Sequence, residues 1–416
     1  MALIESDVPP AQQTSNPLWK NADYLLLWLG QIVSSLGTRV SQIAFPLLVL
    51  TITKSPAEAG LVGAMRTLAY PILILPAGAY VDRWDRKRVM ILCDAGRAIA
   101  LGSIPLAIAT GHLSILQLAV VALFEGMLFT FFNVAETACL PRVVGKEQVA
   151  RAVSFNMSTD AVSQMAGPSI GGALYGFGRA VPFLTDAISY AASVVTLSRI
   201  RTQFQGERPE TETHLWQEVR EGMVWLWRQP LMRVLALMIG TLNLFSMGWV
   251  LLIIVLAQRF QASSFSIGLV LAAGGIGGVI GASLSNWLQA RFGLRATMLS
   301  AVWLWSMTWP IYLVQSIPVM AVAEAVGFTG ASIFMVTALS YRLFVTPDHL
   351  QGRVNAIYKL LAFGPEPLGL LLTGVLIQLT GPVTALLVCM TPQVILAIWA
   401  SVGGTLRRAA QSVEGT

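Results

Sequence analysis

Charged residues are scarce in this sequence of 416 residues. Asp, Glu, Lys and Arg together make up 12%, against about 25% in typical soluble domains, whereas 55% of the residues are hydrophobic and the mean hydropathy is +0.67. So few charges cannot cover the surface of a soluble protein of this length. Apolar runs of about 20 residues recur along the whole chain, which is the length that a helix needs to cross a bilayer. The sequence therefore predicts a multi-pass membrane protein.

Cysteine and histidine are equally rare, with three of each. Cys93, Cys139 and Cys389 lie far apart in apolar segments or at their ends, so we interpret them as helix-packing residues and not as a disulfide framework. The histidines fall in connectors without metal-ligand spacing, and no G-x-x-x-x-G-K-[ST] motif occurs. We therefore expect no metal site, no cofactor and no ATP hydrolysis. No nucleophile–base pair is recognisable, so the sequence does not indicate an enzyme.

The apolar runs divide the chain into twelve segments. Only Lys54, Arg179 and Arg259 fall in connectors on the outer side when the N-terminus is placed inside, whereas 20 of the 27 Lys and Arg residues lie on the inner side. The positive-inside rule therefore predicts that both termini are cytoplasmic. It also explains the net charge of +6 without a nucleic-acid partner. The predicted segments are 22–52, 57–81, 89–110, 113–140, 151–177, 180–198, 232–258, 265–290, 296–315, 317–345, 353–379 and 383–405.

One long connector divides the twelve segments into two sets of six. The pattern of segments and connectors predicts an all-α membrane protein. Its parts would be tails at 1–20 and 407–416, six-helix halves at 21–199 and 232–406, and a linker at 200–231. From Thr213 the linker has the pattern of an amphipathic helix, which we expect on the inner membrane surface. Arg291-Phe292-Gly293 follows Arg83-Trp84-Asp85 by 208 residues, and 344–355 resembles 143–154 at an offset of 201. These sequence similarities indicate that the two halves are duplicated and parallel, as in transporters whose halves rock against each other.

The turn between the second and third segments, GAYVDRWDRKR (78–88), concentrates charge in one place. Topology alone explains its basic residues but not Gly78 or the two aspartates. The turn resembles the loop 2–3 signature of the major facilitator superfamily, with Asp85 where the family usually has glycine. The resemblance implies the superfamily's fold and a cytoplasmic gate, in which Gly78 allows close helix packing. In that gate Asp82 accepts hydrogen bonds at the start of helix 11, and the arginines pair with acidic groups of the other half. The predicted gate residues are Gly78, Asp82, Arg83, Arg86, Lys87, Asp94, Arg97, Glu136 and Arg291.

A second motif, SQMAGPSIGGALYG (163–176), lies in the fifth segment. By itself it is explained by a proline kink with small residues for close helix packing. It also resembles the antiporter motif of exporting members of the superfamily, carried here by Gly167, Pro168, Gly171 and Gly172, with Ser163 in place of an upstream glycine. Residues 21–56, 132–156 and 219–233 resemble the branch that contains enterobactin exporters and macrolide-efflux proteins. The resemblance implies export.

Ionisable residues inside the apolar segments are functional candidates, because each costs at least about 2.5–3.5 kcal/mol to insert at the centre of a membrane helix. Glu366 lies between Pro365 and Pro367, where the helix must break, and irregular backbone at that depth is tolerated only where it lines a cavity or is buried in protein. We hypothesise that Glu366, Glu125 or Asp160 carries the coupling proton. Related drug antiporters carry an arginine in helix 4, where this chain has Glu125. The remaining candidates are Arg39, Lys359 as a partner of Glu366, and Arg66 as a structural partner of Asp186.

These observations predict a proton-coupled exporter of amphipathic small molecules, such as macrolide-like drugs or a siderophore, which works by alternating access as a monomer in the cell (inner) membrane. Its partners would be the substrate, protons and membrane lipids. Two alternatives remain open. An uptake permease would accumulate one specific small molecule, and a receptor or scaffold would carry an extramembrane domain larger than the connector at 199–231.

Overall fold

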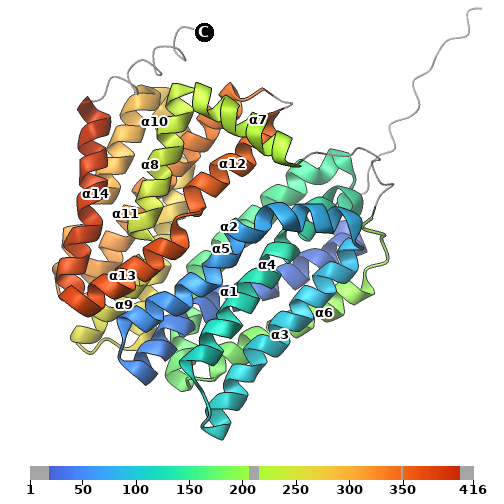
Figure 1. The fold of residues 1–416 in the computed structure, drawn as a ribbon, viewed down its shortest axis with the longest axis horizontal. Helices are drawn as coiled ribbons and strands as arrows, with labels where there is room; N and C mark the ends of the chain where they lie inside the picture. Colours follow the sequence, from blue (N-terminus) through green and yellow to red (C-terminus); the bar gives the residue numbers. More distant parts are fainter. Residues whose placement is uncertain (1–17, 206–214, 348–349, 403–416) are drawn as a thin grey trace, which may run out of the picture.

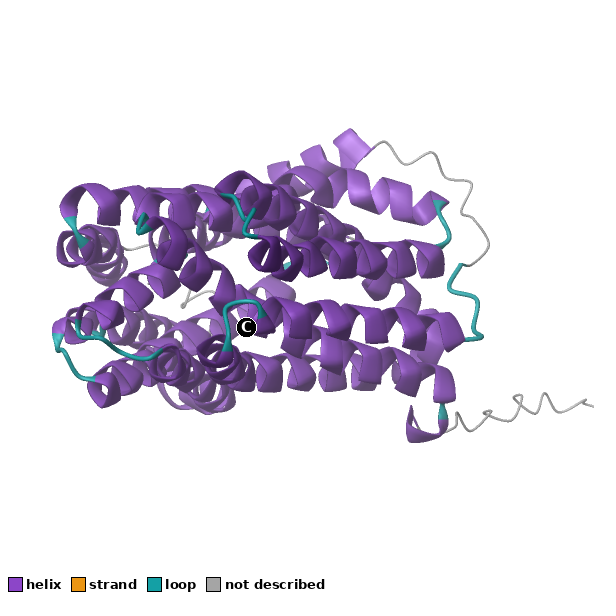
Figure 2. Ribbon diagram, turned by 90° about the horizontal axis from the view of Figure 1, so that it is seen from below, coloured by secondary structure: helices purple, strands orange, loops and turns teal. Residues whose placement is uncertain are grey.

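The computed structural model describes residues 18–205, 215–347 and 350–402, and these residues form helices joined by short turns (Figures 1 and 2). Most of the predicted tails therefore lie outside the described residues. The first four long helices each begin at a side chain that accepts a hydrogen bond from a backbone N–H group of the first turn: Asn21, Ser55, Asp85 and Ser114. The N-terminal half consists of η1 (Leu18–Lys20), α1 (Ala22–Thr53), α2 (Pro56–Arg83), α3 (Arg86–Thr110), α4 (Ile115–Val144), η2 (Lys146–Gln148), α5 (Val149–Phe177) and α6 (Val181–Arg199).

The C-terminal half contains more helices because two of its spans are broken. The break at Gly364 and Pro365 was predicted, whereas the break at Met247 and Gly248 was not. Gly248 lies against the side chain of Thr373, closer than any Cβ atom would allow. The elements are α8 (Pro230–Ser246), α9 (Trp249–Arg259), α10 (Ser264–Met307), η3 (Trp309–Leu313), α11 (Ile317–Val345), α12 (Gln351–Phe363), α13 (Glu366–Thr380) and α14 (Pro382–Val402).

The described helices account for twelve membrane crossings in two halves of six. Ten segments are long and apolar enough to span a membrane by themselves. One of them, Ser264–Leu313, contains two crossings, because Gly293 adopts a φ of 77° in the middle of α10 and turns the chain back. The twelfth crossing is α5, which is less apolar because it carries Arg151 and Asp160.

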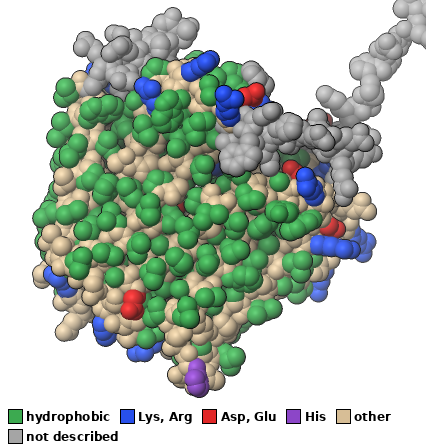
Figure 3. All heavy atoms as spheres, in the orientation of Figure 1, with side chains coloured by type: hydrophobic (Ala, Val, Ile, Leu, Met, Phe, Trp, Pro, Cys, Tyr) green, Lys and Arg blue, Asp and Glu red, His purple; other side chains and the backbone are tan. Residues whose placement is uncertain are grey.

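The lipid-facing surface follows from the spacing of exposed apolar residues. On α3, Leu92, Ile99 and Leu106 recur every seven residues, which is about two helical turns, and their exposed fractions are 69%, 75% and 66%. Figure 3 shows hydrophobic side chains across the middle of the visible face, with Lys and Arg toward its edges. A stripe of this kind can be stable only against lipid or another apolar surface.

The two ends of the bundle are packed differently. We call the end with the α2–α3 turn and α7 the basic end, and the end with the α1–α2 and α9–α10 turns the opposite end. At the opposite end one hydrophobic core joins residues of both halves, such as Leu48 with Leu252. At the basic end each half has its own core, one around Met90 and one around Met232. The halves therefore close on each other at the opposite end and separate toward the basic end (Figure 1).

The amphipathic helix predicted in the linker is present as α7 (Leu215–Arg228), and its predicted start at Thr213 lies outside the described residues. The helix packs against α8 and α12 of the C-terminal half. Leu226 is fully buried, and Glu221 forms an ion pair of 2.5 Å with Arg353. Its expected position on the membrane surface remains a prediction.

Candidate functional site

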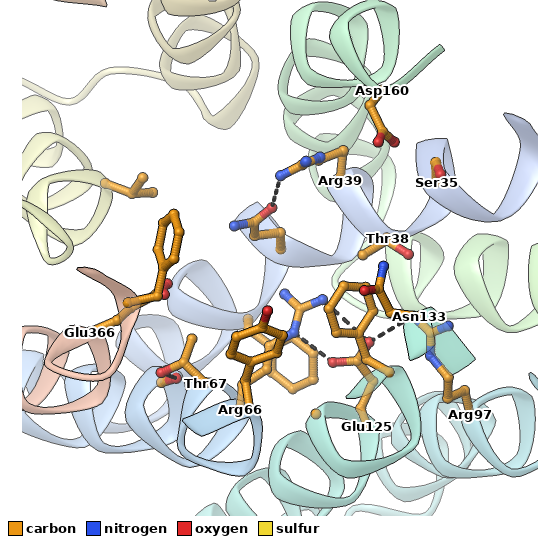
Figure 4. Close-up of a pocket in the computed structure, with 18 of the residues that line it drawn as sticks. Ser35, Thr38, Arg39, Arg66, Thr67, Arg97, Glu125, Asn133, Asp160 and Glu366 are labelled. Carbon is orange, nitrogen blue, oxygen red and sulfur yellow. Dashed lines mark hydrogen bonds and ion pairs between the residues drawn. The ribbon is translucent and has the colours of Figure 1, made fainter. Parts of the chain in front are cut away.

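A central cavity of about 750 Å³ lies between the halves. It is lined by α1, α2, α3, α4 and α5 from one half and by α9, α12, α13 and the break before α9 from the other. Asp186 is not among its lining residues, because it is fully buried within the N-terminal half. The cavity brings together the other candidates for substrate and proton binding: Arg39, Arg66, Glu125, Asp160, Lys359 and Glu366 (Figure 4).

Glu125 lies between two arginines from neighbouring helices. Its Oε2 accepts a hydrogen bond of 2.6 Å from Nε of Arg66, and its Oε1 accepts one of 3.1 Å from the guanidinium of Arg97. The side chains of Glu125 and Arg97 are nearly inaccessible to solvent. Two guanidinium groups on one buried carboxylate hold it as an anion. This geometry corrects the expectation that Arg66 pairs with Asp186.

Arg97 also binds Asp94 and Tyr190. Its guanidinium donates a hydrogen bond of 3.3 Å to Asp94 and another to the Tyr190 hydroxyl, and it lies 3.9 Å from the centre of the Tyr190 ring. Thr38 forms a hydrogen bond of 2.7 Å with the same hydroxyl. Asp94 and Arg97 were predicted as gate residues, but the structure places them in this cluster beside the cavity, and Glu136 lines the cavity as well. Tyr190 was missed; its one signal is its place one turn after Asp186 in an apolar segment.

A second set of polar side chains, from α1 and α5, lines another part of the cavity wall. Arg39 donates a hydrogen bond of 3.2 Å to the Gln42 side chain, and Asp160 of α5 lies beside Arg39 and Ser35 (Figure 4). No ion pair joins Arg39 to Asp160 among the described residues, although both line the cavity. A cation and an anion are therefore available to a ligand at this wall.

Glu366 lies at the break that its two flanking prolines predicted. Phe363 ends α12, and Glu366 is the first residue of α13 after Pro365. The side chain faces the central cavity from the C-terminal half, across from Thr67 and Arg66 (Figure 4). Lys359 lines the same cavity, but the ion pairs among the described residues do not include Lys359 with Glu366. Glu366 thus forms no ion pair with an arginine among the described residues, whereas Glu125 is bound by Arg66 and Arg97.

The predicted gate turn is bound within its own half. Arg86 donates hydrogen bonds of 3.2 Å to Asp82 and 3.0 Å to the Ala138 carbonyl, and Lys87 donates one of 2.6 Å to the Ile200 carbonyl. The Asp82 side chain was expected to accept hydrogen bonds at the start of the eleventh predicted segment, which is α12; among the described residues it forms none there, and it is 70% exposed. A Cβ atom at Gly78 would meet nothing within 4 Å, so that glycine is not in a close packing contact here. The reason is that the halves are separated at this end; Arg291 of the other half is exposed as well.

The predicted antiporter motif lies where the halves meet. Gly167 and Gly171 face α1, whereas Gly172 and the Pro168 carbonyl contact Ser264 and Gly268 of α10. A matching contact joins α2 to α13 at Gly60 and Gly374. A Cβ atom added to either glycine would lie 3.0 Å from the Cα atom of the other. We call these two contacts the glycine seams. Gly60, Gly268 and Gly374 were not singled out from the sequence, because a glycine in an apolar helix does not reveal which neighbour it meets.

Comparison with known proteins matches this architecture to one family. The family model of transmembrane secretion effectors matches residues 13–412. The chain belongs to the major facilitator superfamily. It is a membrane transporter and not an enzyme.

Two curated transporters cover most of the chain. The multidrug efflux pump Tap of Mycolicibacterium fortuitum is 28% identical over 393 residues, which cover 91% of this chain and 95% of the pump. The enterobactin exporter EntS of Escherichia coli is 24% identical over 368 residues, which cover 86% of each protein. The resemblance to exporting branches is thus confirmed at the level of the family.

Solved structures of this superfamily have the same fold. The nucleoside transporter NupG, as a D323A mutant, has a TM-score of 0.76 at 13% identity, over 92% of this chain and 99% of that one. A bacterial homologue of ferroportin has a TM-score of 0.70 in its inward-facing state, over 92% of this chain and 100% of that one, and of 0.60 in its outward-facing state, over 91% and 98%. Their identities are 16% and 17%.

Proposed function

We propose that this transporter is a proton-coupled exporter of amphipathic small molecules that works by alternating access in the cell membrane. The observation that carries the proposal is the central cavity, where acidic, basic and aromatic side chains of both halves surround one space. Both curated relatives named above are exporters by their descriptions, of drugs in one case and of a siderophore in the other. The chain would act as a monomer with both termini in the cytoplasm, by the positive-inside rule. With this orientation the basic end, where the halves separate, faces the cytoplasm, and the cavity opens to that side.

The proton carrier we propose is Glu366. Of the three candidate carboxylates, Glu125 is bound by Arg66 and Arg97 and stays charged, and Asp160 lies beside Arg39. Glu366 lines the cavity without an ion pair to another described residue. A carboxylate in this setting binds a proton when the cavity closes to water and releases it when water returns. Substrate and proton exchange then follows from the movement of the halves.

The first test is accumulation of a macrolide, a catecholate siderophore and a lipophilic dye in cells that express the protein, with and without a protonophore. Export predicts lower accumulation of at least one compound, which the protonophore restores. Higher accumulation of one compound would establish the uptake alternative instead. Arg39 and Asp160, which present both charges to the cavity, are compatible with either direction.

The second test separates coupling from binding. In proteoliposomes, Glu366→Gln is expected to abolish transport driven by a pH gradient while substrate counterflow, which needs no net proton movement, continues. Glu147→Gln, an exposed acid outside the cavity, is the matched control and should keep both activities. Gradient-driven transport at the parent rate in Glu366→Gln would show that another group carries the proton.

A further inference from the structure

The two walls of the central cavity differ in chemistry. Among the described residues that line the cavity, every side chain with an amide or hydroxyl group belongs to α1, α2, α4 or α5 of the N-terminal half. The C-terminal half contributes Lys359, Glu366 and an otherwise apolar surface, which consists of Met247, Trp249, Val250, Leu251, Phe363 and Leu370. A ligand between the halves therefore meets hydrogen-bonding groups on one side, and hydrocarbon and aromatic rings on the other.

Six polar side chains of the N-terminal half lie at a similar depth on three helices. Each helix carries an amide and, three or four residues away, an oxygen acceptor, and this spacing places both on the same face of the helix. The central helix of the three, α1, contacts both α4 and α5. All six residues lie roughly 10–20 Å along the helix axis from the basic end, at 1.5 Å per residue. We call them the polar face: Gln31 and Ser35 on α1, Asn133 and Glu136 on α4, and Asn156 and Asp160 on α5.

Much of the polar face has no partner within the described protein. Nε2 of Gln31 is buried without a hydrogen-bond partner among the described residues. The hydrogen bonds of the described residues include none from the side chains of Asn133 and Asn156, and the ion pairs include neither Glu136 nor Asp160. Figure 4 shows Asn133 and Asp160 at the cavity wall. Polar groups without partners cost free energy once the cavity loses its water, so a ligand that pairs with them is favoured.

The donors and acceptors of the polar face match a ligand with several oxygen groups. The amide N–H groups of Gln31, Asn133 and Asn156 can donate to carbonyl, ether and hydroxyl oxygens, whereas the carboxyl groups of Glu136 and Asp160 can accept from hydroxyl groups. An amphipath with one polar group at the end of an apolar chain would leave most of these groups unpaired. A rigid molecule with oxygen groups on one face and hydrocarbon on the other would satisfy both walls.

We propose that the central cavity selects facial amphipaths, which carry several hydroxyl or carbonyl groups on one face of a rigid apolar skeleton. The oxygen-rich face of the ligand lies on the polar face of the N-terminal half, and its hydrocarbon face lies on the apolar wall of the C-terminal half. A volume of about 750 Å³ accommodates a skeleton of several fused rings. The inference rests on the proposed function, and it narrows the substrates from amphipathic molecules in general to one shape in one orientation.

The test uses two neutral probes with the same steroid skeleton. Methyl cholate carries several hydroxyl groups on one face, whereas methyl lithocholate keeps a single hydroxyl group at one end. Binding to the purified full-length protein in detergent is measured by equilibrium dialysis, with protein-free micelles as the reference. Each variant is compared with the parent separately for each probe, so that partition of the probe into micelles cancels.

Asn133→Leu and Asn156→Leu each remove one amide from the polar face and keep a side chain of similar size. Each is expected to weaken binding of methyl cholate by about threefold to tenfold, as loss of one hydrogen bond of ordinary strength requires, and to leave binding of methyl lithocholate unchanged or tighter. Asn286→Leu is the matched control, because Asn286 is an exposed amide of α10 that lies outside the cavity. It should bind both probes as the parent does. Circular dichroism and size-exclusion profiles establish that each variant is folded.

Val250→Asn tests the orientation of the ligand by adding an amide to the apolar wall. It is expected to weaken binding of both probes by about threefold or more, because both present hydrocarbon to that wall and leave the new amide unpaired. Tighter binding of methyl cholate would place its hydroxyl groups on the C-terminal half and overturn the orientation. Unchanged binding of both probes would overturn it as well.

The binding assay needs neither a proton gradient nor transport, so its result is independent of the export proposal. Methyl cholate binding that depends on Asn133 and Asn156, in a protein that exports nothing, supports the ligand class and overturns the proposed function. Equal losses for the two probes, or unchanged methyl cholate affinity in both folded variants, overturn the ligand class even if export is established. Absence of methyl cholate binding to the parent protein also overturns it.

Discussion

The two halves of this transporter contain an acid on equivalent helices but treat it in opposite ways. In the N-terminal half Glu125 is bound by Arg66 and Arg97, and the cluster is completed by Asp94 and Tyr190. In the C-terminal half Glu324 has one tyrosine as its hydrogen-bond partner and an aromatic pocket around it. Two halves of six crossings thus carry an ionic cluster in one case and an acid in an aromatic pocket in the other.

The seams between the halves did not diverge in this way. Gly172 meets Gly268 at one seam, and Gly60 meets Gly374 at the other, with matching helices in each pair. Close packing of backbones leaves no room for side-chain variation, because any Cβ atom at these positions would press on main-chain atoms. The halves therefore meet through equivalent glycine contacts, whereas the residues around their buried acids differ.

The largest effect is expected from breaking the cluster of the N-terminal half. Arg97→Leu leaves Asp94 and part of Glu125 as buried charges without a partner, which should lower the free energy of unfolding by about 3–5 kcal/mol. Thermal unfolding in detergent, followed with a thiol-reactive dye that reports exposure of the buried Cys93 and Cys139, measures the loss. Arg97→Lys keeps the charge and should lose less. An unfolding temperature equal to that of the parent would show that the cluster is not a stabilising unit.

Substitutions at the two glycine seams should reduce transport to a similar extent. Gly172→Val and Gly60→Val each place side-chain atoms against backbone of the other half, so the opposite end should no longer close as it does here, and transport should fall by about tenfold or more because packed backbones yield little. Gly176→Val is the control, because an added Cβ atom there meets nothing within 4 Å. Transport rates in proteoliposomes provide the comparison. A large loss at one seam only would contradict the equivalence of the two.

The smallest effect is expected where the acid has no ion partner. Glu324→Gln keeps the shape of the side chain and replaces a buried acid that no described cation balances, so the free energy of unfolding should change by less than about 1 kcal/mol, or rise. The same dye assay measures it beside Arg97→Leu. A loss as large as that of Arg97→Leu would show that Glu324 is held by a structural ion pair, and would remove the contrast between the halves.

Local features of the chain were predictable because they depend on neighbours in sequence. The break before Glu366 follows from Pro365 and Pro367, and the amphipathic helix of the linker follows from its spacing of apolar residues. The pairing of buried charges was not predictable in the same way. Arg66 was expected to bind Asp186 and instead binds Glu125, because the partner of a side chain depends on which helix packs beside it and how far that helix is rotated.

The amino-acid sequence by itself determined the membrane class, the twelve crossings, the two halves and their junction, since each depends on the composition and length of continuous segments. It also predicted that several acidic residues lie inside membrane-spanning segments. Only the tertiary structure decided which of those acids are neutralised, where the halves close, and that a second pocket exists beside the central cavity. These properties arise from contacts between residues far apart in the sequence, such as Arg97 with Glu125 or Gly60 with Gly374, and no local pattern records such contacts.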